Sequence, residues 1–186
     1  MALRIVGGRL GGRRIEAPAG RGVRPTSERV REAWFSALGA RLAGGRVLDL
    51  FAGSGALGIE ALSRGAAFVQ FVEADRRTCA LLARNLAAVE VGAGARIARA
   101  DVFAWLDRHA GEDPFRIALA DPPYRSGAAA RLVARFEAAP FAGLLCLEHA
   151  VSDPPGGHPV WQRRYGDTAL SFYEPDTEGD GGGGTA

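Results

Sequence analysis

The stretch VLDLFAGSGALGIEAL, residues 47–62, decides the fold of this chain. It joins an apolar run to a run with helical periodicity, and the loop between them carries Gly53, Gly55 and Gly58 in the spacing G-x-G-x-x-G. Glycines at this spacing permit a tight turn and let backbone amides approach a ligand at the positive end of the helix dipole. The pattern alone is weak, because a structural turn also explains it, so its meaning depends on the surrounding residues.

Around this stretch, apolar runs typical of strands alternate with runs typical of helices. The predicted strands are RVLDLF (46–51), AFVQFVEAD (67–75), ARIARAD (95–101), RIALADPPY (116–124) and GLLCLEH (143–149). Five strands separated by helices predict an α/β fold with a mostly parallel sheet covered by helices on both faces. Residues 159–175 predict two further strands around a Gly-Asp turn, so that an antiparallel hairpin closes the edge of a seven-stranded sheet.

Two elements are predicted before this alternation begins. Residues 3–18, LRIVGGRLGGRRIEAP, contain short β-type segments broken by Gly-Gly pairs and predict a small hairpin or extended arm. Residues 24–42 predict a helix with Thr26 and Ser27 as candidate N-caps. The face of this helix that we expect to pack on the core consists of Val30, Ala33, Trp34, Ala37 and Leu38.

We divide the chain into a basic arm at 1–24, a main domain at 25–175 and a glycine-rich tail at 176–186 that we expect to be disordered. No apolar run reaches about 18 residues and no secretory signal is apparent, so we expect a cytoplasmic protein without membrane contact. Cys79 and Cys146 lack the spacing of metal ligands, and we expect no metal site. We also expect a monomer.

Positive charge is concentrated at the N-terminus. Residues 1–46 carry ten arginines against three glutamates, a balance of +7, whereas the remaining residues balance at −5. Such a segment is either a solvated arm or a phosphate-binding surface, because guanidinium groups pair bidentately with phosphate oxygens and release counterions.

Glu73 and Asp49 extend the glycine pattern. Glu73 ends the next predicted strand, twenty residues after Gly53, where a carboxylate can accept hydrogen bonds from both hydroxyls of a ribose. An adenosine-containing cofactor is therefore expected, either a nicotinamide or flavin dinucleotide or S-adenosylmethionine. Asp49 lies inside the strand, where a charge is costly unless it meets a partner. A cationic ligand group would be such a partner, which favours S-adenosylmethionine.

The residues DLFAGSG, 49–55, resemble the cofactor loop of class I S-adenosylmethionine-dependent methyltransferases. The resemblance implies a Rossmann-like fold in which Asp49 serves the methionine moiety, directly or through water. It also implies that Asp101 receives the adenine amino group and that the Val102 amide lies on the ring, although a helix N-cap would also explain Asp101. The cofactor-binding residues expected from this resemblance are Asp49, Phe51, Gly53, Ser54, Gly55, Glu73, Ala74, Asp101 and Val102.

The second motif is DPPY, which follows the fourth predicted strand. The proline rings fix φ and remove N–H groups, so the loop is rigid and its acceptors are aimed before a substrate arrives. Asp121 and the Pro122 carbonyl can each accept one hydrogen of a nucleobase amine, which directs the nitrogen lone pair at a methyl donor. Tyr124 would stack on the base, a contact typically worth about 1–3 kcal/mol. The expected catalytic residues are Asp121, Pro122, Pro123 and Tyr124.

DPPY resembles the signature of amino-methyltransferases, which permits adenine N6, cytosine N4 or guanine N2 as the target. The N-terminal segment is similar to the start of the bacterial 16S ribosomal RNA guanine-N2 methyltransferase family, with Arg-Pro-Thr at 24–26 and Glu-Arg-Val-Arg-Glu at 28–32. Together with the later motifs, this resemblance covers about residues 3–175. It implies methylation of one guanine of 16S rRNA in an assembled or nearly assembled small subunit. RNA phosphates would then contact Arg4, Arg9, Arg13, Arg14, Arg21 and Arg24.

Other functions remain open at this point. A relative acting on another amine, such as adenine N6 in DNA or RNA, would share both motifs. A binding module without activity would share the arm, and a nicotinamide oxidoreductase would share the glycine loop. The oxidoreductase lacks an obvious proton donor, because His109, His149 and His158 lie in no recognisable catalytic motif.

Overall fold

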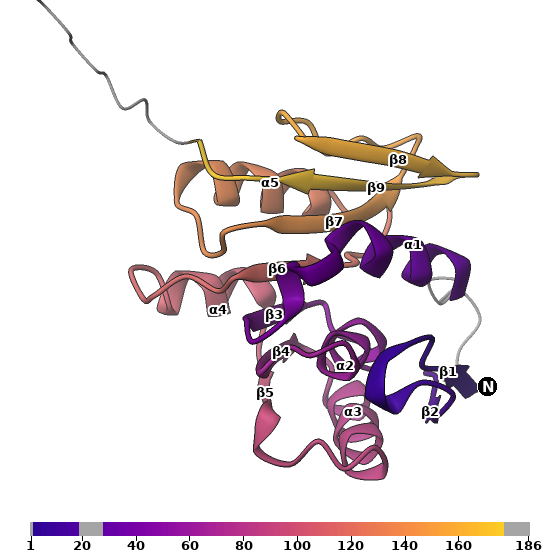
Figure 1. The fold of residues 1–186 in the computed structure, drawn as a ribbon. Coiled ribbons are helices and arrows are strands. Elements are labelled where there is room, and N and C mark those ends of the chain that lie inside the picture. The colour runs from indigo at the N-terminus through magenta and orange to yellow at the C-terminus, as the bar shows by residue number, and fades with distance from the viewer. Residues whose placement is uncertain (1, 19–27, 177–186) are drawn as a thin grey trace, which may run out of the picture.

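The computed structural model describes residues 2–18 and 28–176 and has an α/β architecture (Figure 1). A seven-stranded sheet with the order β5-β4-β3-β6-β7-β9-β8 forms its centre. Its strands are β3 (Arg46–Leu50), β4 (Phe68–Glu73), β5 (Ala95–Arg99), β6 (Ile117–Ala120), β7 (Leu145–Ala150), β8 (Trp161–Tyr165) and β9 (Thr168–Tyr173). β3 to β7 pair in parallel, and β9 pairs antiparallel with β7 and β8. The predicted fold class, including the C-terminal hairpin, is confirmed.

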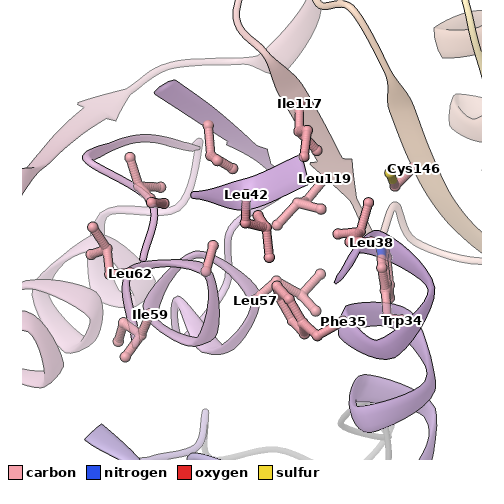
Figure 2. Packing of buried hydrophobic residues seen from close by; sticks show 14 of the residues in the cluster. Trp34, Phe35, Leu38, Leu42, Leu57, Ile59, Leu62, Ile117, Leu119 and Cys146 are labelled. Carbon is pink, nitrogen blue, oxygen red and sulfur yellow. The ribbon is translucent and has the colours of Figure 1, made fainter. Parts of the chain in front are cut away.

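Helices cover both faces of this sheet. They are α1 (Glu28–Leu38), α2 (Ala56–Ser63), α3 (Arg76–Ala88), α4 (Val102–Arg108) and α5 (Ala128–Ala138), with 3-10 turns η1 (Gly8–Leu10), η2 (Gly39–Leu42) and η3 (Gly92–Gly94). Buried residues of α1, α2 and α3 belong to one hydrophobic cluster, shown in part in Figure 2, and those of α4 and α5 belong to a second. Because strand side chains alternate between faces, β3 contributes Val47 to the first cluster and Leu48 to the second.

The buried face of α1 differs from the predicted one. Phe35 is buried and Ala37 is exposed, and the charged Arg31 is buried with only 1% of its surface accessible. Arg31 Nη2 donates a hydrogen bond to the Arg4 carbonyl at 2.9 Å. The guanidinium of Arg64, the residue that caps the C-terminus of α2, lies over the Phe35 ring, with Cζ 5.2 Å from the ring centroid. The face is therefore rotated toward the arm and α2, because α1 packs on these elements as well as on the sheet.

The basic arm forms a separate two-stranded sheet, in which β1 (Ala2–Arg4) pairs antiparallel with β2 (Arg14–Glu16). The predicted hairpin is thus present. Its apolar residues Ile5, Leu10 and Ile15 are buried in the same hydrophobic cluster as α2 and α3. The arm is therefore docked on the same face of the sheet as α1.

The proposed boundary at residue 24 and the candidate caps Thr26 and Ser27 lie outside the described residues, as does the tail after Asp176. The division into arm, domain and tail therefore stays a prediction. Among the described residues, no helix is long and apolar enough to span a membrane. In the same part of the chain, no group of three or more His, Cys, Asp or Glu side chains is arranged so that it could hold a metal ion.

Candidate active site

Both sequence motifs and the predicted acidic residues meet at one edge of the sheet. β4, β3 and β6 are adjacent and parallel, so the loops that follow them lie at the same edge. The glycine loop follows β3, Glu73 ends β4, and DPPY follows β6. From β3 the sheet first grows on one side, through β4 and β5, and then on the other side of β3, from β6 onward. Open α/β sheets bind ligands at such a switch point in the strand order.

The glycine loop turns through unusual backbone conformations. Gly53 and Gly55 have φ angles of 55° and 82°, in the left-handed region that glycine tolerates. Phe51 has a φ of 56°, which a bulky side chain rarely adopts, and its ring meets Phe103 edge-on with centroids 6.3 Å apart. Strain of this kind gathers at functional sites, where the surrounding structure holds it.

The three glycines of the motif have different surroundings. A Cβ atom on Gly55 would overlap a leucine of α3, and one on Gly58 would overlap Phe71 and lie 2.8 Å from Asp49 Oδ2. Close packing therefore requires glycine at position 58, and the left-handed φ favours glycine at position 55. A Cβ atom on Gly53 would have only one carbonyl oxygen nearby, at 3.9 Å. The loop is open at Gly53, where a ligand can approach its backbone.

Asp49 is buried in β3, with 1% of its surface exposed. Its Oδ2 accepts a hydrogen bond from the Gly58 amide at 2.8 Å. Burial raises the pKa of Asp49 well above its ordinary value; the Gly58 hydrogen bond opposes this shift, and the charges of Asp121 and Glu73 add to it. The sequence predicted a cationic ligand group as the partner of Asp49, and the structure supplies a backbone amide.

Glu73 holds the glycine loop in place. Its Oε2 accepts a hydrogen bond from the Gly53 amide at 3.0 Å, and its Oε1 accepts one from the Asp75 amide at 2.8 Å. A carboxylate oxygen can accept more than one hydrogen bond, so both oxygens keep capacity for ribose hydroxyls. Glu73 therefore shapes the loop and remains suited to its predicted role.

Three carboxylates gather at this edge: Asp49 lies in β3, Glu73 ends β4, and Asp121 directly follows β6. The charges of Glu73 and Asp121 both act on Asp49. Like charges that share a site disfavour one another's ionised form, and a nearby cation relieves this cost. The edge of the sheet therefore favours a cationic ligand over an anionic one.

The remaining cofactor residues of the prediction line the same edge. Asp101 is exposed and caps α4, since its carboxylate accepts a hydrogen bond from the Ala104 amide at 3.0 Å. Val102 is the first residue of α4 and is buried, and Ala74 is exposed directly after β4. Ser54 is buried within the glycine loop. The cap role of Asp101 is confirmed, and its contact with adenine stays a prediction.

DPPY forms a corner after β6, as its two prolines predict. Pro122 is buried and Asp121 is half-buried, whereas Pro123 and Tyr124 are exposed. The residue after Tyr124 has a φ of 57°, and Ser126 Oγ donates a hydrogen bond to the Pro123 carbonyl at 2.6 Å. The corner is therefore held by its own backbone and by this hydrogen bond.

Tyr124 has partners that sequence reasoning missed. Its hydroxyl donates to Glu148 Oε1 of β7 at 3.1 Å and lies 3.0 Å from Thr168 Oγ1 of β9. Partial burial, with Glu148 and Asp121 nearby, raises the pKa of Tyr124 to about 12, so the phenol keeps its proton at neutral pH. A small pocket beneath the corner is lined by Pro122, Tyr124, Glu148 and His149, among others. The carboxylate in the apolar run LCLEH was the signal that could have found Glu148.

The described arginines of the arm, which are Arg4, Arg9, Arg13 and Arg14, are exposed to solvent. Arg4 and Arg14 are paired in register on the hairpin, and their neighbours Leu3 and Ile15 turn inward. Arg4 forms an ion pair with Glu28 at 3.1 Å, and Arg13 forms one with Glu90 at 3.7 Å. Exposed pairs of this kind are worth little in water, so both guanidiniums can exchange their partner for a phosphate. Arg21 and Arg24 lie outside the described residues.

Comparisons with known proteins identify the family of this chain. The family model described as "Conserved hypothetical protein 95" matches residues 3–174. "Ribosomal RNA small subunit methyltransferase D" of Escherichia coli K12 is 33% identical, with 96% of this chain and 92% of that protein covered. "Putative rRNA methyltransferase YlbH" of Bacillus subtilis is 38% identical, with 92% and 98% covered.

Solved structures of methyltransferases share the fold of this chain. The Escherichia coli structure described as "Putative methyltransferase yhhF" has a TM-score of 0.80 at 33% identity, with 94% of this chain and 98% of that chain covered. An RNA methyltransferase of Salinibacter ruber in complex with S-adenosyl-L-homocysteine shares the fold, with a TM-score of 0.66 at 14% identity over 84% of this chain and 97% of that chain. The chain therefore belongs to the conserved hypothetical protein 95 family, and to the same family as the small-subunit ribosomal RNA methyltransferase D of Escherichia coli.

Proposed function

We propose that this protein transfers a methyl group from S-adenosylmethionine to the exocyclic N2 amine of a guanine in the 16S rRNA of the small ribosomal subunit. The observation that carries the proposal is the meeting of the glycine loop, an acidic cluster and DPPY at one switch point of the sheet. The relationship to ribosomal RNA methyltransferases supports the RNA substrate.

The residues at this edge fit S-adenosylmethionine. The backbone is open at Gly53, and Glu73 retains acceptor capacity for a ribose. Asp49, Glu73 and Asp121 suit a ligand that carries a sulfonium and an ammonium group, whereas the pyrophosphate of a dinucleotide would be repelled. When bound there, S-adenosylmethionine supplies an electrophilic methyl group, so no strong base is needed.

The DPPY corner would hold the reacting amine. The Asp121 carboxylate and the Pro122 carbonyl each accept one hydrogen of the amine, and these acceptors keep the nitrogen lone pair out of conjugation with the ring. Because the corner is already rigid, little entropy is lost when the amine is positioned. Asp121 or water can take the proton that the methylated nitrogen loses.

The surroundings of the corner suit an unstacked base. Tyr124 is 45% exposed, and its hydroxyl is held by Glu148 and Thr168, so its ring is fixed at the surface for stacking. A guanine amine within a duplex is inaccessible, and the target base must lie in a loop or be extruded. The arm supplies arginines for the phosphates of the same RNA.

Unmethylated small ribosomal subunits, isotope-labelled S-adenosylmethionine and mass spectrometry of the digested nucleosides test this function. We expect label in N2-methylguanosine with the wild-type protein. Label in N6-methyladenosine would show instead that the enzyme methylates the N6 amine of adenine. Absence of label on every base, with cofactor binding demonstrated, would contradict an RNA methyltransferase acting on this particle.

Two variants of Asp121 connect the reaction to the proposed site. Asp121→Ala removes the acceptor oxygen and should abolish transfer. Asp121→Asn retains an acceptor oxygen and should keep measurable activity, because a neutral oxygen can still accept a hydrogen of the amine. Equal activity of Asp121→Ala and the wild type would exclude this corner as the catalytic site.

A further inference from the structure

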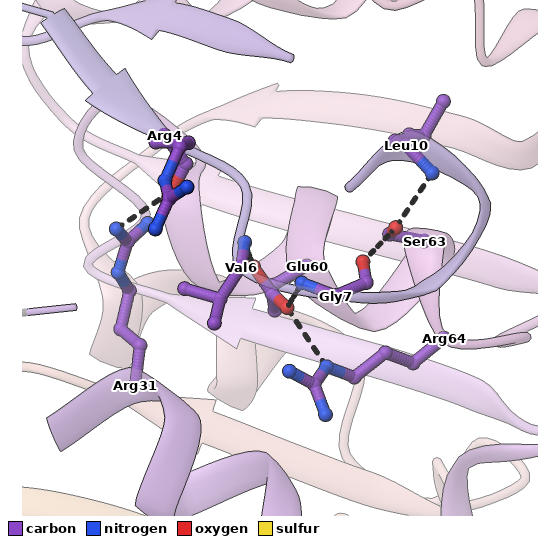
Figure 3. Close-up of polar contacts among 8 residues, drawn as sticks. All are labelled: Arg4, Val6, Gly7, Leu10, Arg31, Glu60, Ser63 and Arg64. Atoms are coloured by element: carbon purple, nitrogen blue, oxygen red, sulfur yellow. Dashed lines mark hydrogen bonds and ion pairs between the residues drawn. The ribbon is translucent and has the colours of Figure 1, made fainter. Parts of the chain in front are cut away.

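The arm is anchored to α2, the helix that begins at the glycine loop. Glu60 of α2 has no exposed surface, and its two carboxylate oxygens accept hydrogen bonds from the backbone amides of Val6 and Gly7, each at 2.8 Å (Figure 3). One turn later, Ser63 Oγ accepts a hydrogen bond from the Leu10 amide at 2.9 Å and donates one to the Gly7 carbonyl. The arm is thus fixed to the body by buried polar contacts as well as by apolar packing.

A second anchor lies on α3, where Asn85 has 2% of its surface exposed. Its Oδ1 accepts a hydrogen bond from the Glu16 amide at 2.8 Å, and its Nδ2 donates to the Glu16 carbonyl at 2.9 Å. The same Nδ2 donates to the Ser54 carbonyl, also at 2.9 Å. One side-chain amide therefore joins β2 of the arm to the middle of the glycine loop.

The hydrogen-bond capacity of Asn85 links these two contacts. The amide nitrogen has two hydrogens and donates one to the Glu16 carbonyl of the arm and the other to the Ser54 carbonyl of the loop. Ser54 lies between Gly53, where the loop is open, and Gly55, the left-handed N-cap of α2. A shift of β2 removes two of the three hydrogen bonds that orient Asn85, and the Ser54 carbonyl then loses its fixed partner.

We propose that Asn85 is a positioning residue that couples the arm to the cofactor loop, so that RNA held by the arm tightens cofactor binding. This inference rests on the proposed function, in which the arm binds RNA and the loop binds S-adenosylmethionine. RNA that presses the arm onto α3 fixes Asn85 and with it the loop. Coupling between two binding sites is reciprocal, and the cofactor must therefore tighten RNA binding by the same factor.

Equilibrium dialysis of labelled S-adenosylhomocysteine, with and without saturating 16S rRNA in the form of unmethylated small ribosomal subunits, measures this coupling. With the wild-type protein we expect the rRNA to lower the Kd of S-adenosylhomocysteine about fivefold, a modest value for coupled sites. Asn85→Asp keeps the shape of the side chain and the oxygen that accepts the hydrogen bond from the Glu16 amide. It replaces the donating nitrogen by a second oxygen, which would face the carbonyl oxygens of Glu16 and Ser54. In this variant the ratio of the two Kd values should fall to about one, because the loop no longer responds to the arm.

Arg84→Ala is the matched control on the same helix. Arg84 Nη2 reaches Glu16 Oε2 at 3.4 Å and is exposed, so its removal weakens an arm contact without touching Ser54. This variant should keep the wild-type ratio. General destabilisation would change the Kd with and without rRNA alike and leave the ratio intact, and the ratio therefore separates coupling from a structural role.

An equal Kd with and without rRNA in a wild-type protein that binds the rRNA would overturn the coupling and leave the proposed function standing. Failure of the wild-type protein to bind unmethylated small ribosomal subunits would instead remove the proposed function, and the coupling with it. If Asn85→Asp does not fold, amide hydrogen exchange of the loop in the wild-type protein decides the matter. We expect rRNA to slow exchange at residues 53–55, and unchanged exchange would refute the coupling.

Discussion

The Tyr124 hydroxyl donates a hydrogen bond to the Glu148 carboxylate, with 3.1 Å between Oη and Oε1. This contact connects the DPPY corner to β7, 24 residues later in the chain. Thr168 of β9 lies 3.0 Å from the same hydroxyl, so the C-terminal hairpin also supports the corner. The ring that we propose as a stacking platform is therefore fixed by two strands of the sheet.

We expect Tyr124→Phe to lower kcat several-fold while leaving the RNA affinity close to that of the wild type. The phenylalanine ring still stacks, but it loses the two hydrogen bonds that orient it, each worth about 1 kcal/mol. Tyr124→Ala should weaken RNA binding as well, because stacking contributes about 1–3 kcal/mol per base. Steady-state methylation kinetics and RNA titrations of both variants test this. If Tyr124→Phe loses RNA affinity as strongly as Tyr124→Ala, the idea that the hydroxyl orients the ring while the ring itself stacks on the base would be contradicted.

Replacing Asp49 by Asn should stabilise the protein without cofactor and weaken cofactor binding. Burial raises the pKa of Asp49, so the folded state disfavours the charged carboxylate. Its contribution to stability therefore decreases as the pH rises above the unfolded pKa of about 3.9 toward the raised folded value. At neutral pH, Asp49→Asn avoids this cost and still accepts the Gly58 hydrogen bond. We expect a Tm higher by about 2–4 °C, the shift that about 1 kcal/mol produces.

Cofactor binding should depend on pH through the same carboxylate. A bound cation favours the charged form of Asp49, so binding releases a proton, and S-adenosylmethionine affinity should fall as the pH is lowered through the pKa of free Asp49. Calorimetric titrations at several pH values, in buffers of different ionisation enthalpy, measure this proton release. Asp49→Asn should lack it. The same pH dependence in the wild type and the variant would show that Asp49 does not face the cationic part of the ligand.

Much of the fold follows from local pattern. Strands such as β6 and β7 are buried on both faces and appear as continuous apolar runs, and this makes a parallel sheet recognisable from the sequence. The glycine loop and DPPY were also recognisable, because their geometry depends on residues next to one another in the chain. Asp49 could be identified as exceptional because a charge inside such a run has an evident cost.

The contacts between distant segments were not predictable in this way. Glu60 and Asn85 resemble ordinary helix residues in the sequence, and their roles depend on backbone groups of the arm, more than 50 residues earlier. The predicted buried face of α1 was wrong at Ala37 for a related reason. A helical pattern identifies the apolar stripe but does not show that a second surface, here the arm and α2, draws Phe35 and Arg31 inward.

Gly8→Ala should detach the arm from α2. Gly8 has a φ of 75°, and a Cβ atom there would overlap the Ser63 carbonyl, which is backbone and cannot move aside. The matched control is Gly12→Ala, since Gly12 has a φ of 85° and open space around it. Both variants carry a left-handed strain of about 1–2 kcal/mol. Only Gly8→Ala should also lose protection of the Val6, Gly7 and Leu10 amides in hydrogen exchange and weaken RNA binding. Equal protection in the two variants would contradict the docked arm.

Replacing Arg9, Arg13 and Arg14 together by Ala should weaken RNA binding and flatten its dependence on salt. Each phosphate contact that is lost lowers the slope of log K against log salt by about 0.7–0.9, so up to three contacts lower it by about 2–3. Cofactor affinity in the absence of RNA should stay unchanged, because among the described residues no hydrogen bond or ion pair joins these side chains to the glycine loop. Binding titrations at several salt concentrations measure the slope. The control removes the same charge from exposed positions outside the arm, by Arg41→Ala, Arg96→Ala and Arg108→Ala. If both triple variants lowered the slope equally, RNA binding would depend on total charge and the arm would not be its site.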